Sequence, residues 1–174
     1  MTTILIAEDD QQIRQALERI LKFEGYSTVA VNDGAAALVL ANEKAVKERG
    51  LKPIARLVNY GGHAQEPEWF TTAPVGATRK ALERAGMKAS DINYWEVNEA
   101  FAVVAMAARK DLEIPDERLN IHGSGCSIGH PIGATGSRIV VTLLHVLQEK
   151  EASKGLATLC IGGGEGLATI WERV

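Results

Sequence analysis

The sequence predicts an α/β fold built on a largely parallel sheet, with an antiparallel pair of strands at its end. Short apolar runs of strand length alternate with longer segments whose apolar residues recur at helical spacing. Glycines and an Asn-Asp-Gly turn separate many of these segments. The last two apolar runs are joined by Gly162-Gly163-Gly164 and indicate the antiparallel pair.

The first third of the chain carries strand and helix signals in alternation. Residues 4–7 form a short apolar run that ends in acidic residues, as a buried parallel strand would. Residues 11–23 place apolar side chains at helical spacing, and residues 27–31 indicate a second strand. Residues 35–41 stay open, because alanine favours a helix whereas the bounded length allows a buried strand.

The rest of the chain continues this alternation. Gly50 and Gly86 are expected to end helices, and Gly61-Gly62-His63 to begin a long loop. A glycine-rich loop over residues 121–136 is expected to open the longest helix. The predicted helices are 43–49, 75–84, 100–110 and 137–150, and the predicted strands are 54–59, 93–97, 156–161 and 166–171.

Composition excludes several classes of protein. Hydrophobic residues make up 46% and charged residues 24%, which is typical of a globular domain. The net charge of -3 gives no footprint for nucleic acid, and no apolar run is long enough to span a membrane. The amino terminus has no secretory signal, and the two cysteines do not suggest a disulfide framework. We therefore expect a cytoplasmic chain with reduced thiols.

The most informative stretch is the glycine-rich segment around His130. Glycines at this density indicate tight turns or close approach of the backbone to a ligand. The helix that follows directs its free amide groups back toward the loop. His130 could act there as a base or donate to a developing oxyanion. A structural loop with a surface histidine is an equally good interpretation of the segment alone.

Two further residues could carry chemistry. Cys160 ends an apolar strand beside three glycines, where a thiolate could be stabilised, although such a cysteine is more often a core residue. Asn98 lies between a strand and a helix, where it could hold a catalytic water or simply cap the helix. His63 and His145 carry little signal, and Cys126 has no base identifiable beside it.

Taken together, five motifs resemble the carboxy-terminal half of the thiolases over residues 32–174. They occur in the order seen in that family, and the Gly-His-Pro block is the most specific of them. The motifs are residues 32–38, 77–82, Asn98-Glu99-Ala100-Phe101, the block 129–134 around His130, and 160–164.

The resemblance implies a layered sheet with helices on both faces and thioester chemistry on acyl-CoA substrates, with no further cofactor. It implies that His130 activates an acyl-accepting thiol and helps bind the thioester oxygen, while Asn98 holds a water in the same oxyanion hole. It also implies that Cys160 removes a proton from the second acyl-CoA and that the Gly162 amide contributes to a second oxyanion hole. Donors aimed at an enolate oxygen and a tuned base suit such a reaction.

Two departures from the family qualify this expectation. The usual Asn-x-Asn-Gly-Gly segment is here Asn120-Ile121-His122-Gly123-Ser124. The amino-terminal half that carries the nucleophilic cysteine has no counterpart in the motifs. We therefore expect a partner, either a complementary thiolase half or further copies of this chain in a homo-oligomer, and no efficient thiolysis by the chain alone.

Residues 1–34 resemble the first strand, helix and second strand of a response-regulator receiver domain. The resemblance implies weak metal candidates in Asp9 and Asp10, since carboxylates suit magnesium. No aspartate occurs in residues 50–62, where the phospho-accepting residue is expected. The sequence thus predicts a receiver-like βαβ segment fused to a thiolase-like domain over residues 35–174, packed as one unit. An inert hybrid scaffold and, less favoured, a degenerate phospho-receiver are the alternatives to a thiolase half.

Overall fold

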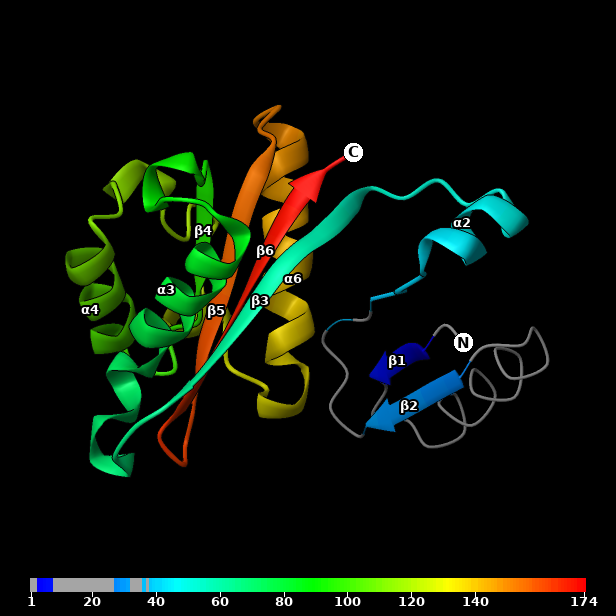
Figure 1. Ribbon diagram of the computed structural model, residues 1–174. Helices are drawn as coiled ribbons and strands as arrows, with labels where there is room; N and C mark the ends of the chain where they lie inside the picture. The colour runs from blue at the N-terminus through cyan, green and yellow to red at the C-terminus, as the bar shows by residue number, and fades with distance from the viewer. Residues whose placement is uncertain (1–2, 8–26, 32–35, 37) are drawn as a thin grey trace. The chain divides into compact units, whose positions relative to one another are not determined.

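The computed structural model describes residues 3–7, 27–31, 36 and 38–174 (Figure 1). The chain divides into two compact units. The first unit comprises Met1–Pro53 together with Pro131–Val141, and the second comprises Ile54–His130 together with Thr142–Val174.

The first unit contains a parallel pair of strands and a short helix. Strands β1 (Thr3–Ala7) and β2 (Ser27–Val31) pair in parallel, which confirms both predicted strands. Helix α2 (Glu43–Arg49) also lies where it was predicted. The Asn42 side chain accepts from the Ala45 amide at 2.8 Å at its start, and Gly50 ends it with a φ of 59°.

Two early predictions meet different outcomes. The helix predicted over residues 11–23 lies outside the described residues. The described part of the open run 35–41 contains neither a helix nor a strand.

The second unit is organised by a four-stranded sheet in the order β3-β6-β5-β4. Strand β4 pairs with β5 in parallel, whereas β6 pairs antiparallel with both β5 and β3. The predicted hairpin at the end of the chain is confirmed, but the prediction of a largely parallel sheet is wrong for this unit. The strands are β3 (Ala55–Ala64), β4 (Tyr94–Val97), β5 (Lys154–Ile161) and β6 (Glu165–Arg173).

Strand β3 is longer than predicted, because Gly61-Gly62-His63 continue the strand instead of opening a loop. Gly61 is required here by packing and not by a turn. A Cβ on Gly61 would lie 2.6 Å from the amide nitrogen of Ala81 in the helix above it. On that helix, Gly76 makes room in the same way for the ring of His63. Both glycines therefore let the helix and the strand approach closely.

The middle of β3 has its backbone groups satisfied by side chains. The Tyr60 amide donates to Asn59 Oδ1 at 2.8 Å, and Arg84 donates to the Tyr60 carbonyl at 3.2 Å. In an antiparallel ladder the N–H and C=O of one residue point the same way, so these groups face away from β6. A register irregularity lies immediately before, between Leu57 and Asn59.

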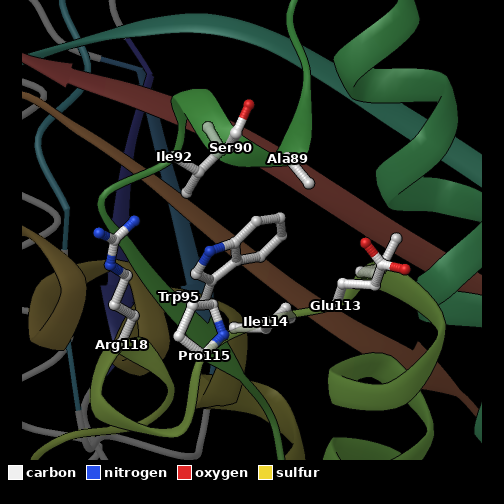
Figure 2. Close-up of a pocket in the computed structure, with 9 residues that line it drawn as sticks. Ala89, Ser90, Ile92, Trp95, Glu113, Ile114, Pro115 and Arg118 are labelled. Atoms are coloured by element: carbon white, nitrogen blue, oxygen red, sulfur yellow. The ribbon is translucent and has the colours of Figure 1, made fainter.

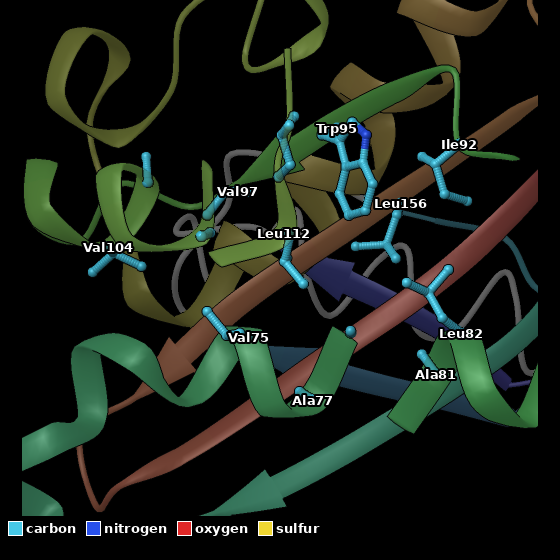
Figure 3. Packing of buried hydrophobic residues seen from close by; sticks show 14 of the residues in the cluster. Val75, Ala77, Ala81, Leu82, Ile92, Trp95, Val97, Val104, Leu112 and Leu156 are labelled. Carbon is cyan, nitrogen blue, oxygen red and sulfur yellow. The ribbon is translucent and has the colours of Figure 1, made fainter. Parts of the chain in front are cut away.

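Helices α3 (Ala73–Ala85) and α4 (Ala102–Leu112) cover one face of the sheet (Figure 1). The core of the second unit lies beneath them, and Figure 3 shows its side chains interdigitating around Trp95 and Leu156. Trp95 is only 2% exposed. Short 3-10 turns connect these elements, at Pro67–Thr72, Ala89–Asp91 and Asp116–Arg118.

The opposite face of the sheet is covered by the second half of helix α6 (Ile132–Glu149), from residue 142 onward. Gly155 and Leu156 are neighbours on β5 and so point to opposite faces. Leu156 belongs to the core under α3 and α4, whereas a Cβ on Gly155 would lie 2.6 Å from Leu143 of α6. Helices therefore lie on both faces of the sheet, which confirms the predicted layered α/β architecture.

The glycine-rich segment contains more regular structure than predicted. A short helix, α5 (Gly125–Ile128), lies inside the expected loop. Helix α6 begins at Ile132 and not at 137, so Gly133 and Gly136 are helical. The expectation of a loop is wrong here, because Gly125, Gly133 and Gly136 lie within helices and do not form turns.

Candidate functional site

Asn98 and Cys160 lie at the same edge of the sheet. Strands β4 and β5 are parallel, so both end at this edge. Asn98 follows β4 directly, and its backbone amide donates to the Thr158 carbonyl of β5 at 2.9 Å. Cys160 is two residues beyond Thr158 on the same strand, so the side chains of Thr158 and Cys160 point to the same face of the sheet.

His130 is brought into contact with Asn98. The Asn98 Nδ2 lies 3.5 Å from both Nδ1 and Nε2 of the imidazole, at the outer limit for a hydrogen bond. Asn98 is fully buried and His130 half-buried. Two residues predicted as site members, 32 positions apart in the chain, therefore face each other.

The capping interpretation of Asn98 is wrong. Helix α4 begins at Ala102, its N-cap is Phe101, and no side chain caps it. A fully buried amide at the end of a strand is an unusual place for a polar side chain that only fills space. The buried Asn98 side chain therefore lies at the carboxyl end of β4 without capping helix α4.

Cys160 occupies a position between core and site. Its side chain is 7% exposed and belongs to the hydrophobic core cluster. Burial raises the pKa of the Cys160 thiol, although a hydrogen bond of its own backbone amide acts in the other direction. The structure thus favours the protonated thiol over the stabilised thiolate that the neighbouring glycines suggested.

The turn after Cys160 places its three glycines differently. Gly162 is exposed, and a Cβ there would meet nothing within 4 Å. Gly164 has a φ of 99°, its amide donates to Ile161 at 3.2 Å, and its carbonyl accepts from the Gln65 amide at 3.0 Å. A Cβ on Gly164 would overlap the Gln65 carbonyl oxygen. The conformation of the turn therefore depends on Gly164, while Gly162 is left accessible.

The structure adds residues that the sequence did not single out as functional. Asn120 and Ser124 lie beside the free edge of β4, and both hydrogen-bond to Val97. Glu99 accepts from Asn120 and from the Cys126 amide. The only signal in the sequence was the position of Asn120 and Ser124 in the segment that departs from the thiolase pattern.

The remaining cysteine and histidines lie outside the contact between Asn98 and His130. Cys126 is exposed, and its thiol donates to the Glu99 carbonyl at 3.8 Å. His122 pairs with Glu149 at 2.7 Å. His63 lies in strand β3 and not in a loop, and its Nε2 is 3.1 Å from Gln65 Oε1. His145 is exposed on α6.

A cavity of about 230 Å³ lies beside Trp95, away from this site (Figure 2). None of Asn98, His130 and Cys160 lines it. Figure 2 shows Trp95 between the charged side chains of Arg118 and Glu113. The lining residues are Ala89, Ser90, Ile92, Trp95, Leu112, Glu113, Ile114, Pro115 and Arg118.

The described ranges carry neither a metal-binding cluster nor a membrane-spanning helix. No group of three or more His, Cys, Asp or Glu side chains in them is placed to hold a metal ion. Asp9 and Asp10, the weak metal candidates, lie outside the described residues. No helix of the described part has the length and apolar character needed to cross a membrane.

Comparison with known proteins gives a consistent result. Residues 51–173 match the family model described as thiolase, C-terminal domain. Acetyl-CoA acetyltransferase of Schizosaccharomyces pombe is 44% identical over 98% of this chain and 46% of its own length. Acetyl-CoA acetyltransferase 1 of Arabidopsis thaliana is 50% identical over 82% of this chain and 34% of its own length.

Solved structures agree with the sequence relatives. The acetyl-CoA acetyltransferase of Bacillus anthracis is similar with a TM-score of 0.77 and 43% identity, over 79% of this chain and 35% of that one. The Acat5 thiolase of Ascaris suum, solved in complex with coenzyme A, is similar with a TM-score of 0.75 and 41% identity, over 79% of this chain and 36% of that one. The chain thus spans less than half the length of these relatives.

Proposed function

Because this chain belongs to the thiolase family, through a match to its C-terminal domain over residues 51–173, we propose that it supplies one half of an active site for acyl-CoA thioesters. The observation that carries the proposal is the contact of Asn98 with His130 at the sheet edge where Cys160 also lies. The relatives named above are acetyl-CoA acetyltransferases and a thiolase solved with coenzyme A.

Asn98 and His130 form the first oxyanion hole in this proposal. The thioester oxygen gains negative charge when a thiol attacks the carbonyl carbon, and donors fixed in advance stabilise that charge. His130 donates directly through a ring N–H, and the buried Asn98 amide holds a water beside it. His130 also takes the proton from the attacking thiol, because a neutral imidazole has one ring nitrogen free to accept a proton while the other carries the N–H that donates.

Cys160 is the proposed acid–base group. In condensation its thiolate removes a proton from the carbon next to the carbonyl of the second acyl-CoA, and in thiolysis its thiol returns that proton. Because burial raises the pKa of the Cys160 thiol, its thiolate is a stronger base once formed. The amide of the exposed Gly162, two residues on, is the proposed donor to the enolate oxygen.

The acyl-accepting thiol is proposed to come from outside these 174 residues. The two cysteines here are Cys160, assigned above, and Cys126, whose thiol donates to the Glu99 carbonyl. The relatives contain a further portion that these 174 residues do not match. A complementary segment of that kind is the proposed source of the thiol. Further copies of this chain in a homo-oligomer are proposed as a separate kind of partner, with cytoplasmic placement and reduced thiols.

An inert α/β scaffold is the second candidate, and the burial of Cys160 within the hydrophobic core favours it. The receiver-like segment over residues 1–34 remains a prediction, supported by the parallel pairing of β1 and β2. Phospho-transfer is not part of the proposal, because no aspartate was found where the acceptor is expected.

Acetoacetyl-CoA thiolysis tests the proposal. The purified chain should show little turnover alone and gain turnover when mixed with the unmatched amino-terminal portion of the Schizosaccharomyces pombe relative. His130→Asn and Cys160→Ser should each lower the turnover of the mixture by roughly 10²- to 10⁴-fold.

His145→Asn is the matched control, because His145 is an exposed histidine on α6. Turnover of the mixture that survives both His130→Asn and Cys160→Ser would leave the scaffold interpretation standing.

A further inference from the structure

We infer that Asn120 and Glu99 form a positioning clamp that sets the placement of His130 against Asn98. The inference deepens the proposed function and rests on it for its catalytic meaning. The Asn120–Glu99 clamp consists of these two side chains and the backbone groups of Val97 and Cys126 to which they bond.

Asn120 takes the place of a neighbouring strand at the free edge of β4. Its backbone amide donates to the Trp95 carbonyl at 2.9 Å. Its side chain accepts from the Val97 amide at 2.8 Å and donates to the Val97 carbonyl at 2.9 Å. The φ of 48° at Asn120, which asparagine tolerates better than most residues, turns the chain so that one residue makes all three bonds.

Glu99 ties the beginning of this segment to its end. One carboxylate oxygen accepts from Asn120 Nδ2 at 3.1 Å, and the other accepts from the Cys126 amide at 3.2 Å. Hydrogen bonds to an ionised acceptor are stronger than those between neutral groups. Because Glu99 follows Asn98 in the chain, the same stretch of backbone carries both the carboxylate and the site amide.

Close packing completes the clamp. A Cβ on Gly125 would lie 2.5 Å from the Glu99 carbonyl oxygen and 3.3 Å from Asn98 Oδ1. The fully buried Ser124 donates to the Val97 carbonyl at 3.2 Å. The segment is therefore held directly against Asn98 and Glu99, with α5 leading from it to His130.

The lengths of the hydrogen bonds show which contacts hold this part of the chain more firmly. The direct contact of Asn98 with His130 is 3.5 Å to either ring nitrogen, too long to fix the ring by itself. The bonds of Asn120 to Val97, at 2.8 and 2.9 Å, have ordinary hydrogen-bond lengths. The clamp therefore holds the segment that leads to His130 by shorter hydrogen bonds than the contact between the imidazole and Asn98.

Asn93, at the other end of β4, offers a matched control. Its side-chain oxygen accepts from the Lys154 amide at 2.9 Å and from the Ser153 hydroxyl at 3.2 Å. Asn93→Ala thus removes the same kind of side-chain support from the same strand, at the end away from His130.

The test records the imidazole Cε1–H NMR signal of His130 in the full chain without substrate, assigned with His130→Asn. We expect the signal to move in Asn120→Ala and in Glu99→Gln and to stay in Asn93→Ala. Asn120→Ala should also speed hydrogen exchange of the Val97 amide roughly tenfold, as the loss of one hydrogen bond does. Glu99→Gln should leave that exchange unchanged, because Asn120 still accepts from Val97.

A further variant, Asn120→Asp, keeps an acceptor for the Val97 amide but puts an oxygen where the donor to the Val97 carbonyl and to Glu99 stood, so it should also move the His130 signal. A signal that stays put in Asn120→Ala and in Glu99→Gln, or moves equally in Asn93→Ala, would overturn the clamp. Should Asn120→Ala fail to fold, Glu99→Gln and Asn120→Asp decide alone. The signal is measured without turnover, so a failed thiolysis assay and a failed clamp remain separate results.

Discussion

The two glycine-rich segments of this chain look alike in sequence but are held by different means. The segment over residues 120–130 is fastened by side chains, chiefly Asn120, Ser124 and Glu99. The turn at residues 161–164 is fastened by backbone hydrogen bonds and by the close packing of Gly164 on Gln65. The first segment should therefore respond to the loss of polar atoms, and the second to the addition of carbon atoms.

Gly164→Ala should have the largest effect on this comparison. Its Cβ would overlap the Gln65 carbonyl oxygen at a φ of 99°, so we expect unfolding free energy to fall by about 2 to 4 kcal/mol. Urea denaturation followed by circular dichroism measures it. Gly162→Ala, with open space around its Cβ, is the control and should change the midpoint little. Equal losses for the two variants would remove the steric explanation.

Ser124→Ala should cost less, about 1 kcal/mol, because it removes the hydrogen bond from a fully buried hydroxyl to the Val97 carbonyl. The same urea titration measures the loss, and Ser90→Ala, an exposed serine, is the reference. A stability equal to that of Ser90→Ala would show that side chains do not fasten the segment.

The cysteines give a smaller, pH-dependent contrast between the two segments. Burial raises the pKa of the Cys160 thiol in the folded protein, so the folded state keeps this proton at pH values where the unfolded chain has released it. The contribution of this group to stability is fully present below the pKa of the unfolded thiol and is lost as the pH rises through the pKa of the folded one. Cys160→Ala should therefore show a shallower alkaline loss of stability than the parent chain in urea titrations.

Cys126→Ala is the control for this measurement, since its side chain is exposed. If both cysteine variants follow the parent chain across the alkaline range, the burial of Cys160 has no energetic consequence.

His122→Ala should have the smallest effect. His122 belongs to the side-chain-fastened segment, but its pairing with Glu149 joins two exposed side chains. The Lys150 ammonium and then His122 hold the pKa of the Glu149 carboxyl below its usual value, and such surface pairs contribute little. We expect no measurable change in the urea midpoint. A loss as large as that of Ser124→Ala would mean that this pair also fastens the segment.

The sequence predicted best where structure is determined locally. Helix α2 lies where it was predicted because its signals, Asn42 before it and Gly50 after it, are neighbours in the chain. The strands of the terminal hairpin were likewise found from their own apolar runs and the glycines between them. Asn98 and His130 were singled out by their motifs, and the fold brings the two together.

Prediction failed where the cause lies far along the chain. The glycines at the end of β3 indicated a loop, but Gly61 is there because helix α3 passes directly over it. Strand direction was wrong because β3 pairs with β6, more than a hundred residues later. The structural role of Asn120 could not be predicted from the sequence, because its hydrogen-bond partners are the backbone groups of Val97, 23 positions away.

The side-chain hydrogen bonds to the backbone of Tyr60, in the middle of β3, affect how this protein can associate. A strand from another molecule that docked along the outer edge of β3 would need the Tyr60 N–H and C=O, and Asn59 and Arg84 already occupy both. The irregularity next to them also disturbs the spacing that a continuous ladder requires. Open-ended, fibril-like growth of the sheet is therefore disfavoured at this edge.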